Sequence, residues 1–136
     1  MKAVRIHQFG GPEVLRFEDV PDPQPRRDQV LVRVKACAMN HLDIFVRNGL
    51  PGVKLPHILG SDIAGEIVEV GEYVTSFKPG QRVLLAPMRF CNHCAKCVAG
   101  LQNQCSEFTV LGNMVDGGTA CHSATTMGFR RSPAPP

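Results

Sequence analysis

The chain has 136 residues, of which 43% are hydrophobic and 20% are charged, and its formal net charge is +3. This length suits one domain with its own core, and the balance is ordinary for a globular protein. There is no long basic run, and Arg26–Arg27 and Arg130–Arg131 are isolated pairs, so we expect no nucleic-acid interface. No stretch approaches the roughly 18 apolar residues of a membrane span, and the first residues lack the apolar core of a signal peptide. We therefore expect a cytoplasmic protein that does not bind membranes.

Alternating apolar residues separated by Gly/Pro turns predict a mostly β fold. The expected strands are, in chain order, 4–6, 14–17, 29–37, 63–70, 82–85 and 108–111. The first two form a hairpin around the turn at 10–12. Many short strands with one short helix indicate a partly open barrel.

A short helix is expected between the third and fourth strands. Asn40 is a typical N-cap, and Asp43 stands three residues later, where a capping box places its acidic partner. Gly49 would end the helix in the left-handed conformation. From about Thr119 neither the helix nor the strand period continues. We therefore expect residues 119–136, which are small, polar and rich in Pro at their end, to be disordered.

The cysteines carry the clearest chemical signal. Four of the six lie within residues 91–105. In a reducing compartment, such crowding favours a metal site over disulfides. The spacing is Cys-x2-Cys-x2-Cys-x7-Cys, and the ligands would be Cys91, Cys94, Cys97 and Cys105. Four thiolates in a tetrahedron form a closed structural zinc site, whose binding free energy contributes to folding.

Other interpretations of these cysteines fit less well. A bacterial iron–sulfur run has three residues before its fourth cysteine and Pro after it, whereas here there are seven and Ser106 follows. A redox Cys-x-x-Cys pair does not need four thiols. His93 could replace one cysteine as a ligand, but four cysteines suffice, so we expect it at the surface. Cys37 lies outside the lobe and is expected to be a small apolar residue at a strand end.

Two further motifs accompany the cysteine lobe. Residues 60–71 read G-S-D-I-A-G-E-I-V-E-V-G, and residues 79–83 read P-G-Q-R-V about ten residues before the lobe. Together they resemble the medium-chain dehydrogenase/reductase family, which includes zinc-containing alcohol dehydrogenases and quinone oxidoreductases. The resemblance covers residues 1–118 and implies a GroES-like N-terminal domain with a zinc lobe at 91–105. In that family a Rossmann domain follows and binds NAD or NADP. The substrates are small alcohols, carbonyls, enones or quinones, and homo-oligomers are possible.

The departures from the family pattern concern the second, catalytic zinc of the alcohol dehydrogenases. Its first ligand is a Cys at the position of Asn40, and its second is a His at the position of Ser61. Since neither replacement is a usual zinc ligand, we expect no catalytic zinc. Hydrogen bonds would then polarise the substrate oxygen.

Asn40 could donate such a bond, and Asp43 could order it or join a proton relay. By the resemblance, Ser61 and Asp62 line the catalytic cleft, and His41 stands where family members often carry an Arg or His against the coenzyme pyrophosphate. Each also has a simpler interpretation. Asn40 and Asp43 could act only as a helix cap, and His41 could be an exposed residue of the first helical turn. Ser61 and its neighbour Asp62 could stabilise only their own turn.

No Gly-x-Gly-x-x-Gly motif follows a strand in this sequence. The turn that holds a coenzyme pyrophosphate is therefore missing, and we expect no dehydrogenase activity from this chain alone. We interpret the chain as an N-terminal fragment of a zinc-containing NAD(P)-dependent oxidoreductase, truncated at about Thr119, with residues 119–136 unrelated to the family. The alternative is a zinc-stabilised interaction module without chemistry of its own.

Overall fold

The computed structural model describes residues 1–126 and 129–131. In chain order, the elements are β1 (Lys2–Ile6), the 3-10 helix η1 (Pro12–Val14), β2 (Arg16–Asp19), β3 (Gln29–Ala38), α1 (His41–Asn48), β4 (His57–Ile58), β5 (Asp62–Val70), β6 (Arg82–Leu85), β7 (Met88–Arg89), α2 (Ala95–Val98), the 3-10 helix η2 (Gln102–Gln104), β8 (Thr109–Val110), β9 (His122–Thr126) and β10 (Phe129–Arg131). The expected mostly β fold is confirmed.

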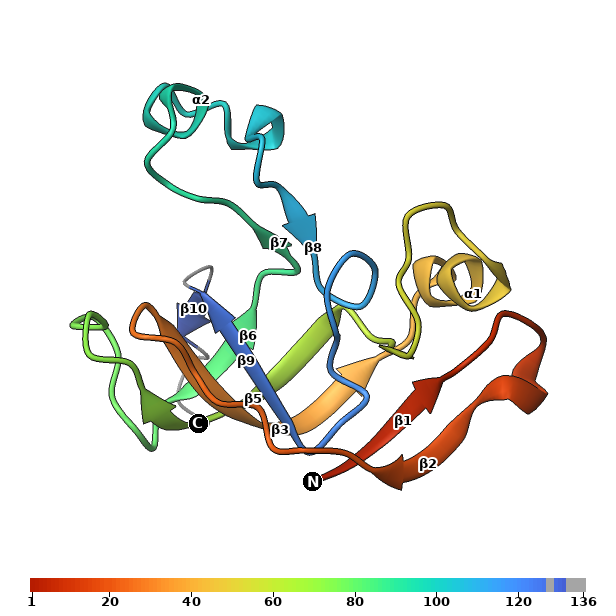
Figure 1. The fold of residues 1–136 in the computed structure, drawn as a ribbon. Coiled ribbons are helices and arrows are strands. Elements are labelled where there is room, and N and C mark those ends of the chain that lie inside the picture. Colours follow the sequence, from red (N-terminus) through yellow and green to blue (C-terminus); the bar gives the residue numbers. More distant parts are fainter. Residues whose placement is uncertain (127–128, 132–136) are drawn as a thin grey trace.

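The strands form open antiparallel sheets. The five-stranded sheet has the order β10-β6-β5-β3-β9, the three-stranded sheet has the order β2-β1-β4, and β7 pairs with β8. The register of β3 against β5 shifts between Leu31 and Val32 and again between Val34 and Ala36. Such bulges bend and twist a sheet, which suits a partly open barrel. Figure 1 shows a lobe containing α2 and η2 that projects from the sheets beyond β7 and β8.

The main core lies on one face of β3 and β5. Val30, Val32 and Ile67 are fully buried there because alternate residues of a strand point to the same side. A second apolar cluster contains Ile6 of β1 and Val46 of α1, so it fixes the helix against the smaller sheet. The two clusters position α1 beside the start of β5, where the candidate site residues lie.

The predicted ends of α1 are confirmed. The backbone N–H of Asn40 donates to Asp43 Oδ2 at 2.7 Å, so the acidic side chain of the expected capping box is in place. At the other end, Gly49 has φ +110°, a left-handed conformation that glycine adopts without a Cβ penalty.

The structure differs from the expected disorder after Thr119. Residues 122–126 form β9, which pairs with β3 from Arg33↔His122 to Gln29↔Thr126. Ser123 and Thr125 are buried with exposed fractions of 5% and 2%, so the inward face of this strand consists of small polar residues. That composition hides the period-2 pattern from a hydrophobicity analysis. Residues 127–128 and 132–136 lie outside the described residues.

Each helix among the described residues is too short or too polar to cross a bilayer.

Candidate functional site

The four-cysteine cluster is built by one turn and two very short helices. Cys91 precedes a turn at Asn92, whose φ of +62° is a left-handed conformation that Asn tolerates better than most residues. Cys94 is the N-cap of α2 and Cys97 lies within that helix. Cys105 follows η2 directly. These local structures bring thiols that are up to fourteen positions apart to one point.

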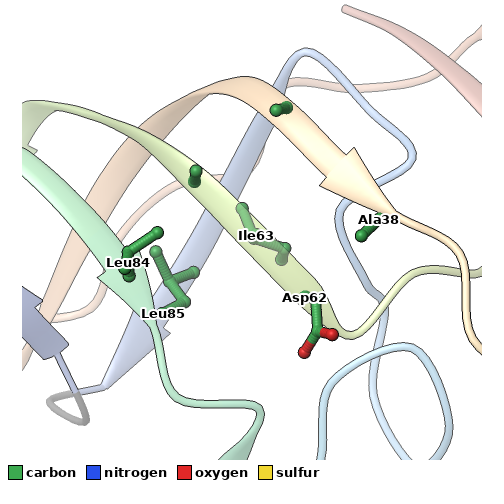
Figure 2. Close-up of a pocket in the computed structure, with 7 residues that line it drawn as sticks. Ala38, Asp62, Ile63, Leu84 and Leu85 are labelled. Carbon is green, nitrogen blue, oxygen red and sulfur yellow. The ribbon is translucent and has the colours of Figure 1, made fainter. Parts of the chain in front are cut away.

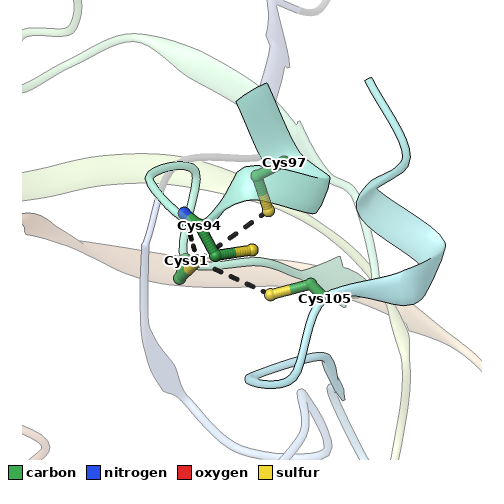
Figure 3. Close-up of side chains that lie close together, drawn as sticks. All are labelled: Cys91, Cys94, Cys97 and Cys105. Atoms are coloured by element: carbon green, nitrogen blue, oxygen red, sulfur yellow. Dashed lines mark hydrogen bonds between the residues drawn. The ribbon is translucent and has the colours of Figure 1, made fainter. Parts of the chain in front are cut away.

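Figure 3 shows the four side chains converging. All four Sγ atoms lie within 4.8 Å of one another. Cys91 Sγ is 3.6 Å from Cys105 Sγ and 3.8 Å from Cys97 Sγ. Cys97 and Cys105 are buried, with exposed fractions of 8% and 6%, whereas Cys91 and Cys94 are half-buried. The predicted cysteine ligands are therefore brought together in an arrangement that fits one tetrahedral metal ion.

Backbone N–H groups also point at the sulfur atoms. The N–H of Cys94 donates to Cys91 Sγ at 3.3 Å, and the N–H of Glu107 donates to Cys105 Sγ at 3.3 Å. A hydrogen bond from the backbone of Cys97 is the main reason that the pKa of Cys94 falls to about 7. The pKa of Cys91 is lowered chiefly by the backbone N–H of His93. Such hydrogen bonds favour the thiolates that a metal ion requires.

Burial has the opposite effect at the inner side of the cluster. It raises the pKa of Cys97 to about 12, because a thiolate there loses its hydration. A divalent cation would compensate for that loss, since a coordinated thiol is deprotonated by the ion. The residues present therefore fit a structural zinc ion.

His93 does not belong to the four-thiol cluster. It is exposed, and its Nδ1 lies 2.8 Å from the backbone oxygen of Cys91. This hydrogen bond is the main reason that the pKa of His93 lies above its ordinary value. His93 does form a second group of potential ligands with Cys91 and Glu107, whose donor atoms lie within 4.8 Å of one another.

Three of the other candidate residues meet where α1 begins beside β5. Asn40 Nδ2 donates to Ser61 Oγ at 3.3 Å and to Asp62 Oδ2 at 3.0 Å. An amide nitrogen carries two protons, so both are used in these two bonds. Ser61 is 4% exposed. The hydroxyl proton of Ser61 is used in neither of these two bonds.

Asp43 lies behind this group and is only 1% exposed. One carboxylate oxygen accepts the backbone N–H of Asn40 at 2.7 Å, and the other accepts that of Gly60 at 2.7 Å. The carboxylate therefore joins the start of α1 to the segment that carries Ser61. This observation favours a positioning role for Asp43 over contact with a substrate.

His41 is exposed on the first turn of α1. Its ring lies 6.3 Å from that of Phe45, measured between centroids and at a tilt of 45°. The structure thus places it near the Asn40 group, and within residues 1–126 and 129–131 it has no polar partner that would fix its orientation.

A shallow groove of about 340 Å³ adjoins Asp62, and sequence reasoning missed it. Figure 2 shows Ala38, Ile63, Leu84 and Leu85 along the groove with the Asp62 carboxylate at one end. Its walls are almost entirely apolar. The signal in the sequence was a set of small residues on neighbouring strands. These are Ala36 and Ala38 at alternate positions of β3, and Ala64 of β5.

Comparison with known families now adds to this geometry. The alcohol dehydrogenase GroES-like domain family matches residues 26–128, which is most of the chain. The chain belongs to this family. The match includes both the cysteine lobe and β9, so the GroES-like domain continues past Thr119.

Relatives of this GroES-like domain include quinone oxidoreductases and alcohol dehydrogenases. A quinone oxidoreductase from Sus scrofa is 46% identical over 86 residues, covering 61% of this chain and 26% of the relative. An NAD-dependent alcohol dehydrogenase from Sulfurisphaera tokodaii is 36% identical over 129 residues, covering 88% of this chain and 37% of the relative. A cobalt- and zinc-bound thermostable alcohol dehydrogenase from Pyrobaculum aerophilum is 29% identical, with a TM-score of 0.90 over 99% of this chain and 42% of that structure.

The GroES-like domain described here therefore spans between about a quarter and two fifths of the length of these three proteins. The fold class and the family resemblance expected from the sequence are confirmed by these matches.

Proposed function

We propose that this chain supplies the GroES-like part of an NAD(P)-dependent oxidoreductase, with one structural zinc and no catalytic zinc. The observation that carries the proposal is the contrast between two places in the molecule. Four thiols converge in the lobe, whereas an amide and two oxygen side chains meet at Asn40, Ser61 and Asp62. The first donor set suits zinc, and neither Asn nor Ser is a usual zinc ligand.

In the lobe, the zinc would be held by the four cysteine thiolates and would supply folding free energy. Binding in such closed sites is worth on the order of 10 kcal/mol. Since all four positions around the ion are filled by sulfur, no water or substrate would reach it. Its role would be to hold the loop between β7 and β8 in shape.

At the Asn40 group, the substrate oxygen would be polarised by hydrogen bonds. Ser61 retains a hydroxyl proton after accepting from Asn40, so it is the donor we assign to a carbonyl or quinone oxygen. Asn40 would orient that hydroxyl, and Asp43 would hold both of their segments through the backbone of Asn40 and Gly60. Bound NAD(P)H would supply the hydride. His41, on the exposed first turn, would contact the coenzyme phosphates.

Reduction requires the nicotinamide to be held against the substrate, and misplacement by about 1 Å can cost a hundredfold in rate. We therefore expect the chain alone to show no turnover of a quinone or enone with NADH or NADPH. The test is a chimera in which this chain replaces the matching region of a quinone oxidoreductase relative.

In the chimera, Ser61→Ala should lower kcat more than it raises KM, because the hydrogen bond to the oxygen strengthens as charge develops. Loss of one such donor commonly costs about a hundredfold. Ser106→Ala, on the lobe surface, is the matched control and should leave kcat unchanged. Equal activity of both variants would contradict the role of Ser61.

The second candidate function is a zinc-stabilised interaction module. It is favoured by apolar side chains at the lobe surface, where Val98 is 77% and Leu101 is 43% exposed. A second copy of the chain could cover them. Sedimentation of the zinc-loaded chain tests this: a dimer that dissociates in Val98→Glu would support the module, and a monomer at all concentrations would exclude self-association.

A further inference from the structure

A second group of metal ligands shares one sulfur with the four-cysteine cluster. Cys91 Sγ, a ring nitrogen of His93 and a carboxylate oxygen of Glu107 lie within 4.8 Å of one another. His93 and Glu107 are exposed, with side-chain fractions of 75% and 66%. The group is therefore an outer site, open to solvent, that touches the inner site through a single shared thiol.

The histidine is oriented in the way that metal-binding histidines commonly are. Its Nδ1 lies 2.8 Å from the backbone oxygen of Cys91, which accepts the Nδ1 proton. In the neutral ring the Nε2 lone pair is then free for a ligand, and a hydrogen bond of this kind fixes the tautomer of many metal-bound histidines. Nε2 points toward Glu107, whose Oε1 is 3.8 Å away.

Glu107 is tied to the inner cluster as well. Its backbone N–H donates to Cys105 Sγ at 3.3 Å. The side chain of Glu107 is thus held at the border between the inner and the outer ligands, although it is not itself close enough to join the four thiols. Sulfur, imidazole nitrogen and carboxylate oxygen are all ordinary zinc ligands.

Burial shows the side from which an ion reaches the inner site. Cys97 and Cys105 are 8% and 6% exposed, so the protein covers the inner side of the cluster. Cys91 is half-buried and lies in a groove of about 380 Å³. His93 and Glu107 line the same groove. The outer ligands therefore stand on the open side of the cluster.

We propose that Cys91, His93 and Glu107 form a transfer site through which zinc enters and leaves the four-cysteine cluster. The inference rests on the proposed structural zinc. Cys91 stays bound throughout, while His93 Nε2 and the Glu107 carboxylate are replaced by the thiolates of Cys94, Cys97 and Cys105. The proton of Cys91 passes to water when the ion first binds, and the protons of the other three thiols follow as their zinc–sulfur bonds form. Release follows the same exchanges in reverse.

The test compares rates and stoichiometry in the full chain. Wild type and the double variant His93→Gln with Glu107→Gln are loaded with zinc, and transfer of the ion to a chromogenic chelator is followed at mildly alkaline pH, where the imidazole is neutral. Both substitutions keep a side chain of similar length and replace the imidazole or carboxylate with an amide, which is not a usual zinc ligand. A second lobe variant, Lys96→Ala with Gln104→Ala, is the matched control.

We expect the His93/Glu107 variant to bind as much zinc as wild type but to release it about tenfold more slowly, because loss of the two intermediate ligands would raise the barrier to ligand exchange by about 1.4 kcal/mol. The control should release zinc at the wild-type rate. An unchanged or faster rate in the His93/Glu107 variant would overturn the transfer site while leaving the structural zinc intact. Loss of bound zinc in that variant would also overturn it, because His93 or Glu107 would then belong to the resident site. If wild type binds no zinc, the structural site fails and the transfer site fails with it.

Discussion

Removal of the Asp43 carboxylate should destabilise the domain strongly, because this one side chain bonds two backbone segments. The two carboxylate oxygens accept the backbone N–H groups of Asn40 and Gly60, each at 2.7 Å, and the side chain is 1% exposed. Asp43→Ala leaves both donors without this partner. An unpaired buried donor costs about 1–3 kcal/mol, so for the two donors we expect a loss of roughly 2–6 kcal/mol in the free energy of unfolding.

Asp43→Asn separates the two bonds. The amide oxygen can still accept one backbone N–H group, but the amide NH2 takes the place of the other oxygen and faces the second N–H group as a donor. Roughly half of the stability lost in Asp43→Ala should therefore be lost in Asp43→Asn. Asp62→Ala is the control, because its exposed carboxylate accepts a side-chain N–H of Asn40 and no buried backbone donor among the described residues, so its loss should cost less than about 1 kcal/mol. Urea unfolding of the zinc-loaded chains, followed by circular dichroism, measures all three. Equal midpoints for Asp43→Ala and Asp62→Ala would refute the reasoning.

Two further predictions concern the sheets. Gly65→Ala places a methyl group against the carbonyl oxygen of Arg33 and 2.5 Å from Val32 Cγ1, so we expect at least the roughly 1–3 kcal/mol that overpacking costs, measured by urea unfolding. The pKa of Glu18 lies below its ordinary value of 4.5, chiefly because of its hydrogen bond with His7. A lowered folded-state pKa stabilises the protein above pH 4.5, and this contribution disappears as the pH falls through the folded value. The difference in thermal midpoint between wild type and Glu18→Gln should therefore shrink in acid, and a constant difference would contradict the prediction.

The sequence predicted the features that depend on local chemistry. The alternation of Val30 and Val32 placed β3 correctly, and the pair Asn40 and Gly49 marked the ends of α1. The cysteine spacing identified four thiols that the structure brings within 4.8 Å. In each case the physical cause acts over a few residues, so the pattern is visible without knowledge of the fold.

Features that depend on tertiary pairing were missed. β9 carries small polar residues at its buried positions Ser123 and Thr125, so its apolar period is absent and only pairing with β3 reveals it. The bonds of Asn40 to Ser61 and Asp62 span more than twenty positions, and they show that both amide protons are used. From the sequence, Asn40 could equally have donated to a substrate. The apolar groove likewise requires three neighbouring strands to be in register.

The central claim is that the lobe holds one structural zinc ion and that Asn40 and Ser61 hold none. The most direct test is elemental analysis of the full chain after expression with zinc and removal of loosely bound metal, with circular dichroism before and after a strong chelator. We predict about one zinc per chain and loss of ordered structure on chelation, as in other sites where binding contributes to folding. Two zinc ions per chain would contradict the absence of a catalytic metal, and a folded chain with none would contradict the structural site.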